Sequence, residues 1–155
     1  MRDDWREEAR EDEQAAAAGR LWARSLAEAL GEAMAAGDIV TVRCGNRSWS
    51  GRVVGLGGDH ALVTTATERV VVNLDGPVLL GRQAETTGGT AGDRSHKSLR
   101  ARLATMELVG DPVEVVTPHG SAVGRIVAAR DHLVVTGTDG EHLVPIAEIG
   151  VVVGG

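Results

Sequence analysis

The only cysteine of the chain is the first candidate for chemistry. Cys44 lies between Arg43 and Arg47, and positive neighbours lower the pKa of a thiol and make it more nucleophilic. No histidine accompanies it in a motif, and the segment Cys44-Gly45-Asn46-Arg47 is typical of a turn. We therefore interpret Cys44 as a small turn residue rather than a nucleophile, and a lone cysteine excludes an internal disulfide.

Two of the five histidines could lie near each other. His132 and His142 fall on consecutive predicted strands, and with Asp131 they would offer two nitrogens and a carboxylate to a metal ion. Leu133 and Leu143 are the residues expected to face the core, which would turn both imidazoles outward. We therefore predict no metal site and no cofactor. The sequence also contains no nucleophile elbow, phosphate-binding loop or dinucleotide motif, so we predict no catalytic residue and no enzyme.

Residues 94–102 form a basic segment without acidic residues, and this segment includes the start of the second predicted helix. Such a segment could contact a phosphate backbone, because bound cations release condensed counterions. The candidate nucleic-acid contacts are Arg94, His96, Lys97, Arg100 and Arg102. The net charge of −6 and the presence of only three aromatic residues, all tryptophan, disfavour such binding.

The elements that must position these residues occur twice. When the chain is shifted by 73 positions, residues 25–81 fall on residues 98–154 without a gap. Gly37-Asp38 then falls on Gly110-Asp111, and Gly51-Arg52 falls on Gly124-Arg125. Self-similarity at a fixed distance indicates a repeated structural unit.

Each unit is predicted to contain one helix and five short strands. In the first, Trp22, Leu26, Leu30 and Ala33 recur at helical spacing, and Gly37 ends the helix. In the second, Leu99, Leu103 and Met106 repeat this stripe, Ser95 or Ser98 is the N-cap, and Gly110 is the stop. The strands are expected at residues 39–43, 49–56, 60–65, 69–74 and 78–80, and at residues 113–117, 122–128, 132–136, 141–146 and 150–153. Gly51 and Gly124 predict sharp bends that let one long strand serve both halves of a small barrel.

The second unit resembles the Sm-like family, which includes the bacterial Hfq proteins. The resemblance rests on Pro112-Val113-Glu114-Val115, on Gly124-Arg125-Ile126, on residues 131–135 and on residues 142–146 with 149–153. The whole chain is similar in arrangement to tandem-barrel proteins of actinobacteria. The resemblance implies a mainly β fold with α caps, made of two tandem units that each contain a helix and a five-stranded Sm-like, or SH3-like, small barrel.

The resemblance does not carry RNA binding over to this chain. Sm-like RNA sites use a polar, often aromatic, loop after the second strand and a basic loop after the fourth. Here these loops are Gly57-Gly58-Asp59 and Asp75-Gly76-Pro77 in one unit, and Arg130-Asp131 and Ala147-Glu148 in the other.

The expected organisation is a charged helical extension at residues 1–20, a first unit at 21–81, a flexible linker at 82–94 and a second unit at 95–155. The runs Val70-Val71-Val72 and Val151-Val152-Val153 are too apolar to stay exposed, so we expect these strands to pair with each other or with a second chain.

We predict a non-enzymatic binding, scaffolding or regulatory module that holds a protein partner, or associates with itself, through barrel edges and the N-terminal helix. The alternative is an Sm-like regulator that binds RNA through the basic segment. No apolar run is long enough to span a membrane, and we expect a cytoplasmic protein.

Overall fold

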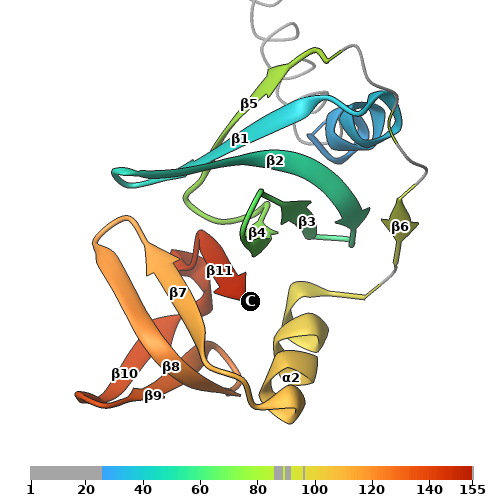
Figure 1. The fold of residues 1–155 in the computed structure, drawn as a ribbon. Coiled ribbons are helices and arrows are strands. Elements are labelled where there is room, and N and C mark those ends of the chain that lie inside the picture. The colour runs from blue at the N-terminus through green and yellow to red at the C-terminus, as the bar shows by residue number, and fades with distance from the viewer. Residues whose placement is uncertain (1–25, 86–88, 90–91, 96, 155) are drawn as a thin grey trace, which may run out of the picture.

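The computed structural model describes residues 26–85, 89, 92–95 and 97–154, which form a mainly β structure with helices at its side (Figure 1). The first part comprises a helix over residues 26–36, β1 (Ile39–Cys44), β2 (Arg47–Leu56), β3 (His60–Thr64), β4 (Arg69–Asn73) and β5 (Leu79–Gln83). The second part comprises β6 (Asp93–Arg94), α2 (Leu99–Val109), β7 (Val113–Thr117), β8 (Gly120–Ala128), β9 (His132–Gly137), β10 (Gly140–Pro145), a 3-10 turn (Ile146–Glu148) and β11 (Val151–Gly154). The prediction of a mainly β chain with helices is confirmed.

The helix ends lie where local chemistry predicts them. Of the two candidate caps for α2, Ser98 is the one used, since its hydroxyl accepts a hydrogen bond from the Ala101 N–H. Gly110 ends the helix with φ 79°, and Gly37 ends the first helix with φ 74°. Both angles lie in the left-handed region, which glycine adopts without steric cost.

At the positions of the predicted bends, Gly51 and Gly124, each long strand changes its pairing partner. Residues 47–51 of β2 pair with β1, whereas its residues from 52 onward pair with β3. β8 divides in the same way, pairing with β7 up to Gly124 and with β9 from Arg125. A Cβ at either glycine would collide with the carbonyl oxygen of Thr64 or Thr136, so the close approach of the two strands requires glycine.

The strands form one open antiparallel path in the order β10-β9-β8-β7-β11-β4-β3-β2-β1-β5, with β6 joined in parallel to the end of β2. Read from β5, the first half of the path is β5-β1-β2-β3-β4 and the second half is β11-β7-β8-β9-β10. Each half therefore begins with its fifth strand and continues from its first to its fourth. The halves meet where β4 pairs with β11, so the two valine runs pair with each other within the chain as expected. We call the pair β4·β11 the internal seam.

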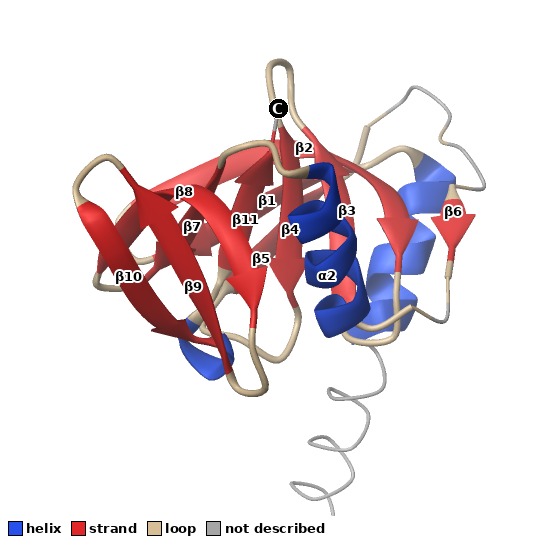
Figure 2. Cartoon of the chain, turned by 90° about the horizontal axis from the view of Figure 1, so that it is seen from below, coloured by secondary structure: helices blue, strands red, loops and turns tan. Residues whose placement is uncertain are grey.

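Two hydrophobic clusters lie on either side of the internal seam. The first core contains Leu30, Val42, Trp49 and Val63, and the second contains Leu103, Val115, Leu133 and Ile149. The helix over residues 26–36 contributes to the first core and α2 to the second. Figure 2 shows α2 lying across the strands near the junction of the two halves.

The pairings correct the ungapped alignment of the two halves. The register of β2 with β3 shifts between Val53 and Gly55, which places one extra residue in β2. Val63 pairs with Val53 and Val70, and Val135 takes the same place between Ile126 and His142. Beyond the bulge, therefore, residues with equivalent pairings in the two halves lie 72 positions apart in the sequence, not 73.

The fifth strand and the expected linker also differ from the prediction. β5 continues to Gln83, past the expected end at Leu80, because Arg82 pairs with Val40 of β1. The guanidinium of Arg82 also binds the buried carboxylate of Asp38 at 2.6 Å. Asp93 and Arg94, expected in a flexible linker, form β6. The expected N-terminal extension at residues 1–20 and Trp22 lie outside the described residues.

Among the residues that the structure describes, no helix is long and apolar enough to cross a membrane.

Candidate functional site

The two ends of the strand path are open edges. Within the described part of the chain, β5 pairs only with β1 and β10 pairs only with β9. Each edge carries a leucine that is mostly exposed, Leu79 on β5 at 66% and Leu143 on β10 at 68%. Open edges offer unpaired backbone donors and acceptors, and a neighbouring apolar side chain adds affinity. These edges are therefore the candidate sites for the addition of another strand.

The exposure of Leu143 shows that its expected inward orientation is wrong. Val144, and not Leu143, lies opposite the buried Leu133, and residues directly opposite each other share one face of an antiparallel pair. Leu133 is buried as expected.

The histidine pair does not form a site. His132 lies opposite Pro145 and His142 opposite Val135, so the two imidazoles lie three residue pairs apart along the hairpin. Nδ1 of His132 is 2.7 Å from Oδ1 of Asp131, and this hydrogen bond lowers the pKa of the Asp131 carboxyl. In the described ranges, no three His, Cys, Asp or Glu residues are grouped to hold a metal ion.

Cys44 is buried at the end of β1 rather than placed in an open turn. Its Sγ lies 3.9 Å from the carbonyl oxygen of Val116, and Gly150 packs directly against it. Burial raises the pKa of the thiol and outweighs the lowering effect of Arg47. The interpretation of Cys44 as a turn residue is wrong, because it ends β1, and the thiol serves as a packing residue between the two halves.

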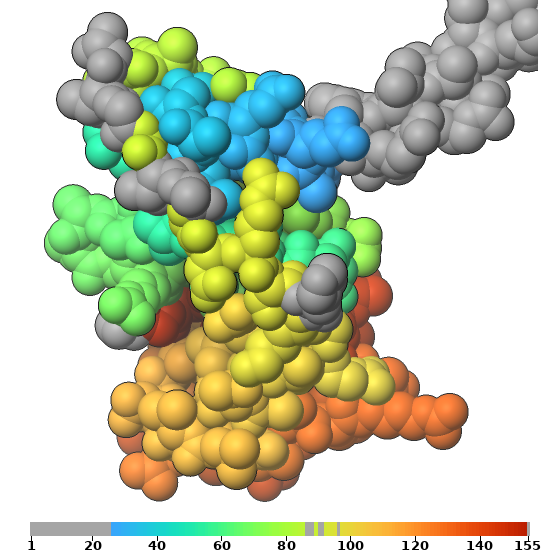
Figure 3. Space-filling model, turned by 90° about the vertical axis from the view of Figure 1, so that its right-hand side faces the viewer, coloured from blue at the N-terminus to red at the C-terminus, as the bar shows by residue number. Residues whose placement is uncertain are grey.

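The described residues of the basic segment make different contacts. Arg94 lies against Gly31 of the first helix, the Lys97 ammonium donates to the Thr105 hydroxyl at 3.0 Å, and Arg102 points inward to His60. Arg100 is exposed, and its charge helps to lower the pKa of Asp131. His96 lies outside the described residues. In Figure 3 the yellow segment containing β6 and the start of α2 runs over the junction between the two halves.

A buried histidine connects the first half to α2. His60 is fully buried, and its Nε2 accepts a hydrogen bond from Nε of Arg102 at 2.9 Å. Because the guanidinium can only donate, Nδ1 carries the ring proton and donates to Oδ1 of Asp59 at 3.1 Å. The same carboxylate oxygen accepts from the Leu99 N–H at 2.7 Å and so caps α2 from the other half of the chain. Sequence reasoning missed this network, whose only signal was the repeated Asp-His pair.

An ion pair crosses the junction on another element. Arg47 of β2 approaches Glu114 of β7 at 2.7 Å and also lies over the Trp49 ring, 4.9 Å from its centroid. The hydrogen bond from Arg47, followed by that from Ser121, lowers the pKa of Glu114. Both charged side chains remain partly exposed, so the pair orients the halves more than it stabilises them.

The internal seam includes a buried polar residue. The Asn73 side-chain amide donates to the carbonyl oxygens of Ile149 at 2.9 Å and of Ile146 at 3.3 Å. The Asn73 backbone N–H donates to Gly150 at 2.9 Å. Asn73 thus holds the turn that leads into β11 against the end of β4.

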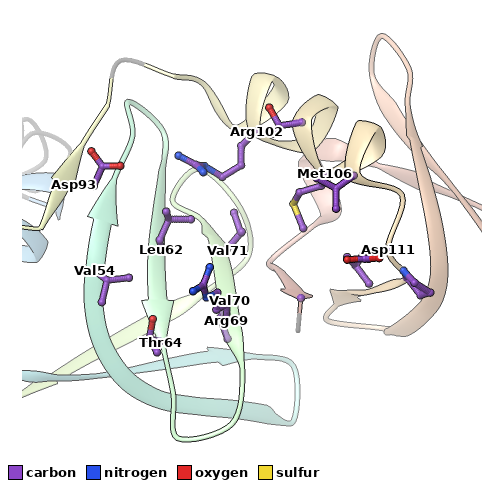
Figure 4. A pocket seen from close by; sticks show the side chains of 15 residues that line it. Val54, Leu62, Thr64, Arg69, Val70, Val71, Asp93, Arg102, Met106 and Asp111 are labelled. Carbon is purple, nitrogen blue, oxygen red and sulfur yellow. The ribbon is translucent and has the colours of Figure 1, made fainter.

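A cavity of about 630 Å³ lies between α2 and the outer face of β2, β3 and β4 (Figure 4). Apolar side chains from both sides line it, including Val54, Leu62, Val71 and Met106. Its charged lining residues are two arginines and two aspartates, Arg69, Arg102, Asp93 and Asp111. Their formal charges cancel, so the cavity favours neither an anion nor a cation.

Comparison of the sequence with known protein families finds no match, and comparison with curated proteins finds none either.

Proposed function

We propose that this chain is a non-enzymatic binding or scaffolding module made of two Sm-like small barrels, and that it holds another polypeptide along its open edges β5 and β10. The matching strand orders of the two halves and the partner changes at Gly51 and Gly124 support the two-barrel interpretation. The expected contribution of the N-terminal helix falls largely on residues 1–25 and takes no part in this proposal.

The observation that carries the proposal is the combination of open backbone and exposed leucine at both ends of the strand path. Leu79 and Leu143 lie directly on the edge strands, where an added strand would cover them. Folded proteins normally protect such edges with charge, proline or covering segments. Here Arg82 in β5, and Glu141 and Pro145 in β10, protect part of each edge, whereas the exposed Leu79 and Leu143 are apolar positions where strand addition would bury surface.

The alternative, an RNA-binding regulator, has weaker support from the side chains. Lys97 and Arg102 are engaged in hydrogen bonds with Thr105 and His60, and Arg94 lies against the first helix. Arg94 and Arg100 are both exposed, but they lie on different elements, β6 and α2. The catalytic alternative loses its best nucleophile, because Cys44 is buried with a raised pKa.

The test uses an extended peptide with the sequence of residues 149–154, which in the folded chain lies along β4. A fluorescently labelled form is titrated with the full protein, and binding is followed by anisotropy. We expect saturable binding that the L143R variant loses, because an arginine on β10 would bury an unpaired charge. The L108R variant is the matched control, since Leu108 is 87% exposed on α2 and belongs to neither edge strand. Absence of binding, or equal loss in both variants, would overturn the proposal.

A further inference from the structure

Asp59 and His60 in the first half hold a helix of the second half by two hydrogen bonds. Oδ1 of Asp59 accepts from the Leu99 N–H at 2.7 Å, and Nε2 of His60 accepts from Nε of Arg102 at 2.9 Å. Both bonds end on α2. The Asp-His pair is therefore a docking point for a helix that begins at the carboxylate and carries an arginine three residues further on.

An apolar row on the neighbouring strands faces the same helix. Leu62 of β3 lies opposite Val71 of β4, so their side chains share the outer face of the sheet. They line the cavity together with Arg102 and Met106, and Figure 4 shows these two side chains reaching into it from α2. Leu99, Arg102 and Met106 are spaced by three and four residues, which places them on one face of the helix.

The second half repeats the Asp-His pair. Oδ1 of Asp131 lies 2.7 Å from Nδ1 of His132, and the same two kinds of atom join Asp59 to His60 at 3.1 Å. Both residues follow their counterparts by 72 positions, the separation of equivalent pairings beyond the bulge. Here, however, the Asp131 carboxylate is 86% exposed, and Nε2 of His132 has no hydrogen-bond partner among the residues that the structure describes.

The second half also repeats the apolar row. Val134 of β9 lies opposite both Val127 of β8 and Leu143 of β10, so the three side chains share the outer face. Val127 is 50% and Leu143 is 68% exposed, whereas Val71, the counterpart of Leu143, is 8% exposed. A hollow of about 250 Å³ connects this row to the Asp-His pair and is lined by Asp131, His132, Leu143 and Pro145.

From this repetition we infer that the outer face of the second half is a docking site for an amphipathic helix of a different protein. The first helical residue of the partner donates its N–H to Asp131. An arginine three residues later donates to Nε2 of His132, and an apolar side chain four residues beyond that arginine packs on Leu143 and Val134. The exposed carboxylate also attracts the positive end of the partner helix and its arginine.

This site is separate from the proposed strand addition, because it uses the side chains of a sheet face rather than the open backbone of an edge strand. The two kinds of binding can therefore be tested, and can fail, independently.

The helices of this chain do not meet the requirement. In the first helix Ala29 stands where α2 has Arg102, so a second copy would bring no guanidinium to His132. In α2 the Leu99 N–H and the Arg102 guanidinium are already engaged with the first half. None of the five arginines in residues 1–25 is followed by an apolar residue four positions later. These observations favour a foreign helix over a segment of this protein.

The test uses a peptide with the sequence of residues 98–109 and blocked ends, since it contains the helix start, the arginine and the methionine of α2. A fluorescently labelled form is titrated with the full protein, and anisotropy follows binding. We expect saturable binding that weakens about tenfold in D131A and in H132A, because each variant removes one hydrogen bond in which a partner is charged. D139A is the matched control, since Asp139 is exposed at the other end of the β9–β10 hairpin.

A change in the peptide identifies the contact between arginine and histidine. R102Q in the peptide should weaken binding to the unmodified protein about tenfold and should weaken binding to H132A no further, because the two changes remove the same hydrogen bond. R100Q in the peptide is the control. It removes the same charge two residues away, on another face of the helix.

Four results would overturn the inference. They are an absence of saturable binding, equal losses in D131A and D139A, losses from R102Q and H132A that simply add, and self-association of the unmodified protein that D131A abolishes. The last result would make a second copy the occupant. The 149–154 peptide needs no contact with Asp131, so D131A should bind it like the unmodified protein, and the proposed strand addition is judged by that peptide alone.

Discussion

At the scale of single residues, the molecule uses its charged groups mainly to position backbone. Asp38 follows the end of the first helix, is buried, and accepts hydrogen bonds from Nε of Arg82 at 2.6 Å and from the Glu85 N–H at 3.3 Å. The hydrogen bond from Arg82 is the largest cause of the lowered pKa of the Asp38 carboxyl. One residue thus ties the helix end to the outer edge strand β5.

This pairing predicts a pH dependence of stability. Because the pKa of Asp38 is lower in the folded state than in the unfolded state, its ionised form stabilises the fold above its ordinary pKa. That contribution is lost as the pH falls below about 4 and passes through the lowered pKa. In R82Q the folded-state pKa of the Asp38 carboxyl returns towards its ordinary value. The unfolding free energy of this variant should therefore fall less at acidic pH than that of the unmodified protein. Urea unfolding of both proteins between pH 2 and 7 measures the effect, and parallel stability curves would contradict it.

Residue patterns predicted some side-chain environments and missed others for identifiable reasons. Alternation along a strand separates two faces, but it does not say which face is inside when both carry apolar residues. In the run His142-Leu143-Val144, the choice was settled by the hairpin register that puts Val144 opposite Leu133. The burial of Cys44 likewise depends on Gly150 and Val116, which are distant in sequence.

At the scale of elements, α2 depends on a cap from the other half of the chain. The helix has no acidic residue in its first turn, and Asp59 supplies a carboxylate to the Leu99 N–H while also holding the buried His60. An anion near a helix N-terminus is favourable because the first N–H groups lack partners within the helix. The loop between β2 and β3 therefore orients α2 over the junction.

The repeated Asp-His pair offers a matched test of this role. D59A removes the acceptor of the Leu99 N–H and leaves the Nδ1 proton of buried His60 unpaired, so we expect a loss of about 2 kcal/mol in unfolding free energy. D131A removes a carboxylate that is 86% exposed and bonded to a partly exposed histidine, and its effect should stay within about 0.5 kcal/mol. Denaturant unfolding compares the two variants. Equal losses would show that Asp59 does not support α2 from across the junction.

The elements themselves were largely predictable from sequence. Gly37, Gly110 and Ser98 mark helix ends by local chemistry, and Gly51 and Gly124 mark the bends by the absence of a side chain. The bulge at Val53–Gly55 was missed because the ungapped alignment at 73 positions hides it, although Asp59-His60 and Asp131-His132 lie 72 positions apart. The added length of β5 depends on Arg82 meeting Asp38 and was also beyond local reasoning.

At the scale of the whole molecule, the internal seam makes the two cores mutually dependent. The valine runs predicted this pairing by their composition, but sequence alone left open whether they would meet each other or a second chain. Because Val71 completes the second core while Val151 and Val153 complete the first, neither half buries its apolar residues without the other. The open edges could be recognised only once the strand order was known.

This interdependence predicts a single unfolding transition. Trp49 packs in the first core and reports on it by fluorescence once Trp5 and Trp22 are replaced by phenylalanine. Far-UV circular dichroism reports on all strands of both halves. We expect the two signals to give the same midpoint in urea, because losing the internal seam exposes both cores at once. A fluorescence midpoint clearly separated from the dichroism midpoint would show that the halves unfold independently.

The internal seam also imposes a delay on synthesis. The ribosome makes β11 roughly eighty residues after it completes β4. At a translation rate of about 5–20 residues per second, the nascent first half waits several seconds with its three valines uncovered. Its permanent cover, β11, is made after all the other described strands, so the interior of the first half is finished by a segment from the far end of the second half.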